Sequence, residues 1–300
     1  MKYGGEGVGL FRTEYLFLAR RSLPPEEEQV AAYREVAETL APKTVIIRTF
    51  DIGGDKPVSG LTRPDERNPF LGWRAIRIGL DRPDLLLTQL RAILRASAAG
   101  NVRMMFPMIS DLGELKRAKE LLEEAKRELR EEGVKFDESL PVGIMVEVPA
   151  VAMLAERFAP LVDFFSIGTN DLVQFALAVD RGNEYVAHLH TPFHPAVLHL
   201  IRETVKAGHA HGIWVGLCGE FAADPLATLL LIGLELDELS ISPAQIPEVK
   251  KLIRSTTFEL AQRMARKALR AETPGQVRDI LLREMKRRFA DMPIWFSRTR

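Results

Sequence analysis

The stretch VGIMVEVP (residues 142–149) has the apolar, β-branched composition of a short buried β-strand. An ionisable carboxylate, that of Glu147, interrupts the apolar run near its end. A buried carboxylate without a partner is costly, so Glu147 requires a cation or several hydrogen-bond donors. The fold must bring such a partner to the end of this strand.

Other short apolar segments of the same kind alternate along the chain with amphipathic helical segments such as residues 25–41 and 113–133. This alternation predicts a parallel α/β architecture. The alternating charges of residues 113–133 indicate a helix with a solvated outer face. The other predicted strands are GVGLFRTE (7–14), TVIIRTFD (44–51), VRMMFPM (102–108), DFFSIGTND (163–171), GIWVGLCGE (212–220) and ELSISP (238–243).

Most of these predicted strands finish in polar residues, among them Arg12 with Glu14, Arg48 with Asp51, Asn170 with Asp171, and Cys218 with Glu220. In a (β/α)8 barrel the carboxyl ends of all strands meet at one mouth, where active sites lie. In a doubly wound sheet only the strands near the switch point contribute to a site. Polar endings on so many strands favour a (β/α)8 TIM-type barrel.

Composition excludes several classes of protein. The 41 basic and 41 acidic residues cancel, so no net field attracts nucleic acid or an anionic membrane surface. The single cysteine cannot form an internal disulfide, and the sequence has neither a signal peptide nor an apolar run long enough to span a bilayer. These features favour a cytoplasmic protein that binds neither nucleic acid nor membranes.

Four arginines are candidate anion ligands: Arg12, Arg48, Arg74 and Arg181. A guanidinium offers planar, paired donors that match phosphate and carboxylate oxygens. The alternative is that each arginine forms a structural ion pair, but Arg12 and Arg48 interrupt apolar strands at matching places, which favours a role in substrate binding. The long connection at residues 51–77, which includes Arg74, has the composition and length of a binding loop or lid.

Glu147 and Asp171 stand at the ends of separate predicted strands. Two carboxylates suit a magnesium ion, which takes one or two protein carboxylates and completes its octahedron with substrate and water. The alternative is that both carboxylates pair only with the arginines. Cys218, judged by composition alone, is a small buried apolar residue.

Seven segments together have a familiar order and spacing: GVGLFRTEYLF, RTFDIGGDKP, NPFLGWRAIR, FPMI, IMVEVPA, FFSIGTNDLVQFALAVDRGN and LCGE. They closely resemble the phosphoenolpyruvate-binding domain of enzyme I of the bacterial sugar phosphotransferase system. The resemblance covers about residues 4–255. It implies a (β/α)8 barrel that binds phosphoenolpyruvate (PEP) and Mg²⁺ and forms homodimers.

Carried onto matching positions, the resemblance implies a set of roles. Arg12, Arg48 and Arg181 would hold the phosphate or carboxylate of PEP, with Arg74 nearby, and Asn170 would contact the phosphate. Glu147 and Asp171 would be the magnesium ligands. Cys218 would protonate the enolate to give pyruvate, in place of the passive role that composition suggests.

The chain departs from the family pattern in two respects. No glycine-rich Ser-His motif is present, so the phosphohistidine domain that receives the phosphoryl group and passes it to a carrier protein is absent. We therefore expect a fragment that binds PEP without completing the transfer. The barrel's first strand and helix are also expected to be missing, and residues 256–300 are predicted to form a helical extension and tail beyond the barrel domain of residues 1–255.

Two alternatives stay open within related chemistry. Pyruvate phosphate dikinases and PEP synthases share the strand-end arginines, the metal pair and the cysteine acid, although FLGWRAIR fits enzyme I better. Magnesium-dependent pyruvate aldolases also place an enolate on a similar barrel with an arginine and a carboxylate pair. Such an aldolase would not need both Arg181 and a proton-donating Cys218.

Overall fold

The computed structural model describes residues 2–18, 22–53, 61 and 66–288. By its internal contacts the chain divides into two compact units. The first unit comprises Glu6–Val146 and Leu161–Phe164, and the second comprises Met1–Gly5, Glu147–Pro160 and Phe165–Arg300.

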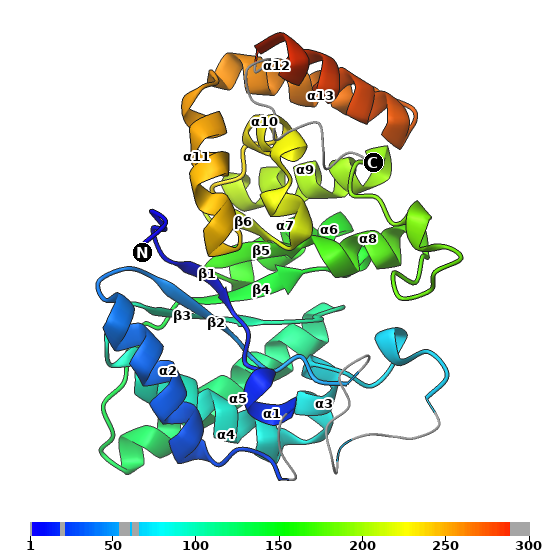
Figure 1. The fold of residues 1–300 in the computed structure, drawn as a ribbon. Coiled ribbons are helices and arrows are strands. Elements are labelled where there is room, and N and C mark those ends of the chain that lie inside the picture. The colour runs from blue at the N-terminus through cyan, green and yellow to red at the C-terminus, as the bar shows by residue number, and fades with distance from the viewer. Residues whose placement is uncertain (1, 19–21, 54–60, 62–65, 289–300) are drawn as a thin grey trace. The chain divides into compact units, whose positions relative to one another are not determined.

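The first unit alternates strands and helices, as the sequence predicts (Figure 1). Its elements are β1 (Val8–Phe11), α1 (Tyr15–Leu18), α2 (Glu26–Leu40), β2 (Val45–Arg48), η1 (Pro69–Leu71), α3 (Ile76–Asp81), α4 (Pro83–Ser97), β3 (Val102–Phe106), α5 (Leu112–Glu131) and β4 (Val142–Val146).

The strands of the first unit form a parallel sheet in chain order. β1 pairs with β2, β2 with β3, and β3 with β4, and Arg48 lies opposite Met105 at the end of β2. Because each connection returns the chain to the same end of the sheet, the carboxyl ends of these strands lie at one edge. The polar residues that the sequence places at strand ends begin the loops along that edge.

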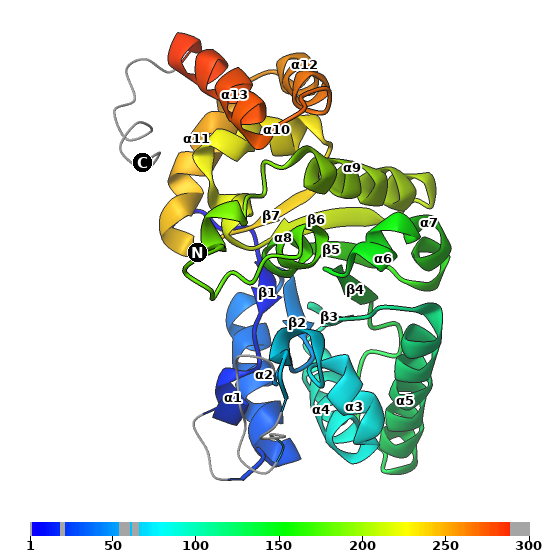
Figure 2. The same ribbon diagram turned by 90° about the vertical axis from the view of Figure 1, so that its right-hand side faces the viewer.

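Helices α2, α4 and α5 pack side by side along this unit (Figure 2). The helix predicted at residues 113–133 is α5, and its apolar residues Leu115, Leu122 and Leu129 are buried while most of its charged residues are not. Asp111 and Glu114 form a capping box at its amino end. The prediction of a helix with a charged outer face is confirmed.

The second unit continues the alternation of helices and strands. The elements that lie wholly or largely in it are α6 (Pro149–Met153), α7 (Ala155–Phe158), η2 (Ala159–Leu161), β5 (Phe164–Gly168), α8 (Thr169–Leu177), η3 (Ala187–Leu189), α9 (Pro195–Ala210), β6 (Trp214–Cys218), η4 (Glu220–Ala223), α10 (Pro225–Gly233), β7 (Glu238–Ser240), η5 (Pro243–Gln245), α11 (Ile246–Arg254), α12 (Phe258–Ala268) and α13 (Pro274–Arg288).

Strand β6 lies between β5 and β7, and its pairing with β7 is parallel. Helix α10 packs against α12, and Gly233 makes this crossing close because the backbone of Ala261 occupies the place of a β-carbon. Helix α13 in turn packs on α12 (Figure 2). The predicted boundary at residue 255 falls between α11 and α12, within the second unit, and the division there stays a prediction.

The predicted fold class is confirmed. Within the described residues the chain has seven strands, which follow chain order in the sheet and alternate with helices, as in a (β/α)8 barrel that lacks one strand. Each strand is shorter than its predicted range, and in most of them the polar residues at the carboxyl end belong to the following loop or helix. No helix in the described part of the chain is both long and apolar enough to cross a membrane.

Candidate functional site

The predicted site residues fall into two groups, one in each unit. Arg12, Arg48 and Arg74 belong to the first unit. The second unit contains Glu147, Asn170, Asp171, Arg181 and Cys218.

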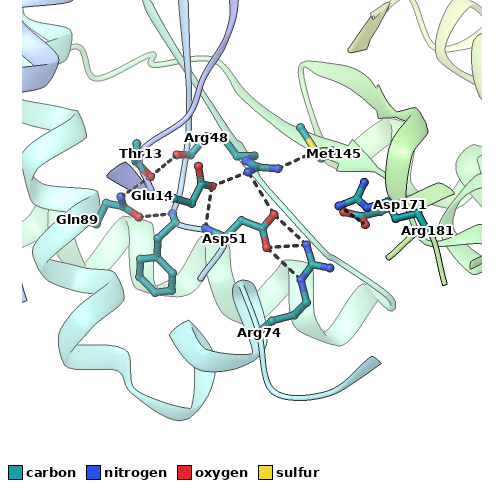
Figure 3. Close-up of polar contacts among 10 residues, drawn as sticks. Thr13, Glu14, Arg48, Asp51, Arg74, Gln89, Met145, Asp171 and Arg181 are labelled. Atoms are coloured by element: carbon teal, nitrogen blue, oxygen red, sulfur yellow. Dashed lines mark hydrogen bonds and ion pairs between the residues drawn. The ribbon is translucent and has the colours of Figure 1, made fainter. Parts of the chain in front are cut away.

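Arg48 is the last residue of β2 and is only 5% exposed. Its Nη2 atom lies 2.5 Å from Oε1 of Glu14 and 3.2 Å from Oδ2 of Asp51. Its Nη1 atom lies 3.4 Å from the sulfur of Met145. Figure 3 shows these contacts, which hold the guanidinium between two buried carboxylates at the ends of β1 and β2.

Arg74 pairs with the same Asp51 from the far end of the long connection that begins after β2 (Figure 3). Its Nη2 atom lies 2.9 Å from each carboxylate oxygen, and its Nε atom donates to Oδ1 over 3.1 Å. Both side chains are almost fully buried. A bidentate pair of this kind fixes the plane of the guanidinium as well as its position.

The backbone also joins the two ends of this connection. Ala75 N donates to the carbonyl of Ile52 over 2.9 Å. A β-carbon on Gly53, which has φ +90°, would lie 2.6 Å from the carbonyl oxygen of Trp73. The segments before and after the loop are thus in direct contact, while residues 54–60 and 62–65 of the predicted lid lie outside the described residues.

The buried cluster formed by Glu14, Arg48, Asp51 and Arg74 is formally neutral, because it contains two carboxylates and two guanidiniums. Arg48 and Arg74 therefore both form buried ion pairs, and their role in substrate binding stays a prediction. Glu14 and Asp51 are recognisable in the sequence as strand-end residues, but nothing in the local pattern marks them as the arginines' partners. Arg12 follows β1 and is exposed.

In the second unit, Glu147 and Asp171 are both buried, at 1% and 6% exposure. Glu147 directly follows β4, and Asp171 lies in the first turn of α8. Oδ1 of Asp171 lies 3.6 Å from Nη2 of Arg181 (Figure 3). The backbone N–H of Arg181 donates to Oε1 of Gln174. Charged carboxylates are kept in a protein interior by partners of opposite charge, and Arg181 is one such partner for Asp171.

The carboxylate oxygens of Glu147 and Asp171 suit a hard divalent cation, and burial shields both side chains from bulk water. No group of three or more His, Cys, Asp or Glu side chains within the described residues is placed to hold a metal. Magnesium needs only one or two protein carboxylates, so Glu147 and Asp171 stay the predicted ligands.

Cys218 ends β6 and is 3% exposed, with its thiol 3.5 Å from the carbonyl of Ile167 in the neighbouring β5. The turn after it is attached to the start of α8. The hydroxyl of Thr169 donates to the carbonyl of Cys218 over 2.8 Å, and Glu220 N donates to Oδ1 of Asn170 over 3.3 Å. The side chains of Thr169 and Asn170 thus each form a hydrogen bond with the backbone of the segment Cys218–Glu220.

Gly219 makes this attachment possible. Its φ is +103°, and a β-carbon there would lie 2.5 Å from Oγ1 of Thr169 and 3.0 Å from Oδ1 of Asn170. Only glycine accepts both the backbone angle and the close approach. Thr169, Asn170 and Glu220 also line an open cleft in this unit. Neither Thr169 nor Gly219 was singled out from the sequence, although Gly219 directly follows the only cysteine.

Comparison with known proteins identifies the family. Residues 1–258 match the family described as PEP-utilising enzyme, PEP-binding domain. The chain belongs to this PEP-binding domain family. The resemblance seen in the sequence motifs is therefore confirmed, and with it the assignment to an enzyme family.

Several named proteins are similar in sequence to this chain. The phosphoenolpyruvate-protein phosphotransferase of Haemophilus influenzae is 53% identical over 278 residues, which are 93% of this chain and 48% of that protein. The protein of the same name from Staphylococcus carnosus is 47% identical over 278 residues, again 93% of this chain and 48% of the relative. The chain spans about half the length of these relatives.

Among solved structures, the malate synthase of Haloferax volcanii in its magnesium and glyoxylate complex has a TM-score of 0.51 to this chain. The match covers 90% of this chain and 77% of the malate synthase, at 14% sequence identity. At that identity the similarity concerns the fold alone, and it agrees with the α/β class described above.

Proposed function

We propose that the chain is the PEP-binding part of a phosphoenolpyruvate-protein phosphotransferase. The observation that carries the proposal is the 53% identity to a protein of that name over 93% of the chain. In the proposed reaction the phosphoryl group of PEP moves to a histidine on another domain and then to a phosphocarrier protein of sugar transport, and pyruvate is released. As the resemblance implies, the protein would act as a cytoplasmic homodimer.

The chain's own residues have separate proposed roles in this reaction. Arg12, Arg48 and Arg181 bind the phosphate or carboxylate of PEP, with Arg74 adjacent and Asn170 in contact with the phosphate. Phosphoryl transfer depends on neutralising the charge of the transferring oxygens, which guanidiniums supply. Glu14 and Asp51 support this role, because their ion pairs orient the guanidiniums of Arg48 and Arg74 before substrate arrives.

Glu147 and Asp171 are the proposed ligands of a magnesium ion. When bound, the ion supplies positive charge for the phosphate and enolate oxygens. The burial of both carboxylates supports this assignment, since a cation near them offsets the cost of keeping them charged.

Cys218 is the proposed acid. When the bond between phosphorus and the enol oxygen breaks, the electron pair stays on the pyruvate enolate. The Cys218 thiol then donates its proton to the methylene carbon, which gives pyruvate and a thiolate that solvent reprotonates. The attachment of the Cys218–Glu220 turn to Thr169 and Asn170 supports this role, because it holds the thiol in one place.

The alternatives from the sequence analysis are not favoured. The relatives that share about half of their residues with this chain are named phosphoenolpyruvate-protein phosphotransferases, not dikinases or aldolases. The likeness to malate synthase is limited to the fold.

Isothermal titration calorimetry with PEP tests the proposal directly. We expect binding in the presence of Mg²⁺, strong weakening when the metal is removed, and loss of binding in Arg48→Ala. Since hydrogen bonds to charged groups contribute about 1.5–3 kcal/mol each, removal of one guanidinium should weaken binding by at least about tenfold.

Arg82→Ala is the control, because Arg82 is an exposed arginine of the same unit whose guanidinium pairs with the nearby Asp84. It should bind PEP as the unaltered chain does. Arg48→Lys keeps the charge but not the planar donors, and it serves if Arg48→Ala does not fold. Tight binding that needs no metal would contradict the proposed site.

A further inference from the structure

A buried glutamine on α4 joins the carboxyl ends of β1 and β2. Gln89 is completely buried. Its Oε1 atom accepts a hydrogen bond from Phe50 N over 2.7 Å. Its Nε2 atom donates to Oγ1 of Thr13 over 3.2 Å and to the hydroxyl of Tyr33 over 2.9 Å. One carboxamide thus links α4 to α2 and to the residues that follow two strands.

The direction of every hydrogen bond around this amide is determined. The hydroxyl of Thr13 accepts from Gln89 and donates to the carbonyl of Arg48 over 3.1 Å. The hydroxyl of Tyr33 accepts from Gln89 and donates to Oε1 of Gln29 over 3.0 Å. Burial raises the pKa of Tyr33, so the phenol keeps the proton that it donates. The amide of Gln89 therefore has one orientation in which all partners are satisfied.

These bonds hold the segment that carries the buried charges. Residues 48–51 are held by Thr13 at the Arg48 carbonyl and by Gln89 at the Phe50 N–H. The side chains of Arg48 and Asp51 leave the backbone at the two ends of this segment, and Asp51 in turn holds Arg74. A shift of the segment would therefore move both guanidiniums together.

We propose that Gln89 is a positioning residue for anion binding: it sets the place of Arg48 and Asp51, and through Asp51 that of Arg74. The inference rests on the proposed function, in which these guanidiniums meet PEP. Gln89 itself does not touch the substrate. Its effect is preorganisation, and a displacement of about 1 Å at a binding group can reduce rate or affinity roughly a hundredfold.

A buried, hydrogen-bonded carboxamide could also serve stability alone, and the chain contains a matched control for that role. Asn101 is 9% exposed and lies near the amino end of β2. Its Nδ2 atom donates to the carbonyls of Ala37 over 2.9 Å and Lys43 over 2.7 Å. Gln89 and Asn101 thus support opposite ends of one strand, and only the end near Gln89 carries the arginines.

The test compares Gln89→Met and Asn101→Leu, which have similar shapes to the originals but no amide. PEP affinity is measured by calorimetry with Mg²⁺, and the melting temperature by circular dichroism. Both variants should lose about 2–10 °C in melting temperature, since each removes hydrogen bonds to buried backbone groups. Only Gln89→Met should bind PEP more weakly, by about ten- to a hundredfold.

Equal PEP affinity in Gln89→Met and the unaltered chain would overturn the inference. Equal weakening in both variants would also overturn it, because the loss would then follow from stability. If the unaltered chain does not bind PEP with Mg²⁺, the proposed function fails, and this inference fails with it.

Gln89→Glu gives a second readout that a purely structural role would not produce, and it serves if Gln89→Met does not fold. A protonated carboxyl group can accept from Phe50 N and donate one hydrogen bond, whereas the ionised form can donate none. Ionisable groups around it include Tyr33 on α2, which accepts a hydrogen bond from Gln89, and Tyr15 and Glu14, which act electrostatically on Tyr33. The affinity of this variant relative to the unaltered chain should fall as pH rises, and a ratio that is flat with pH would overturn the inference.

Discussion

Removing the carboxylate of Asp51 should destabilise the chain far more than removing an exposed carboxylate with a similar ion pair. Asp51 is 2% exposed and accepts from Nη2 of Arg74 over 2.9 Å at both oxygens. It also lies 3.2 Å from Nη2 of Arg48. The variant Asp51→Ala would leave two buried guanidiniums with Glu14 as their remaining carboxylate partner in the cluster.

The magnitude follows from burial. Coulomb's law gives about 6 kcal/mol for unit charges at a separation like that of Asp51 and Arg74 with an effective dielectric constant of about 20. Desolvation offsets part of this attraction, and removing one partner of a buried pair typically costs about 3–5 kcal/mol. With a urea dependence of about 1–3 kcal/mol per molar, the unfolding midpoint should fall by roughly 1–5 M.

The assay is urea unfolding followed by circular dichroism, with Asp84→Ala as the control. Asp84 pairs with Arg82 over 2.8 Å, almost the same distance, but both side chains are exposed at 61% and 45%. Solvent screens that pair, so the control should leave the midpoint unchanged within experimental error. If Asp51→Ala and Asp84→Ala shift the midpoint equally, burial does not strengthen the cluster and the reasoning is wrong.

Two further predictions concern the second unit. Gly219→Ala should lower the melting temperature more than Gly212→Ala. Both glycines have positive φ, but of the two only Gly219 has atoms where a β-carbon would lie. Similar losses in the two variants would show that the contact with Thr169 relaxes freely. Burial raises the pKa of Asp224 above that of the unfolded chain, so the folded state binds more protons between the two values and the free energy of unfolding falls as pH rises through that range. Asp224→Asn keeps a helix-capping side chain but removes the buried charge. It should therefore raise the melting temperature at about pH 7 but not at about pH 4. A gain that is the same at both pH values would refute the burial effect.

The local pattern of residues was enough to predict the strands and their positions along the chain. The apolar runs at 44–51 and 142–149 contain β2 and β4, and the charged helix at 113–133 is α5. Hydrophobic periodicity and strand length are properties of neighbouring residues, so they can be read along the chain. The same local reading placed Arg48 and Glu147 at strand ends, and the motifs around them indicated the family.

The partners of those side chains were decided by tertiary structure. Thr13 and Gln89 are 76 residues apart in the sequence, and Asp51 and Arg74 are separated by 23. Nothing in the local pattern marks Gln89 as different from any other polar residue of a helix. Hydrogen bonds and ion pairs depend on which distant elements pack together and on how fully they exclude water. The residue types present at the strand ends were therefore determined by the sequence alone, and the contacts that orient them were determined only by the fold.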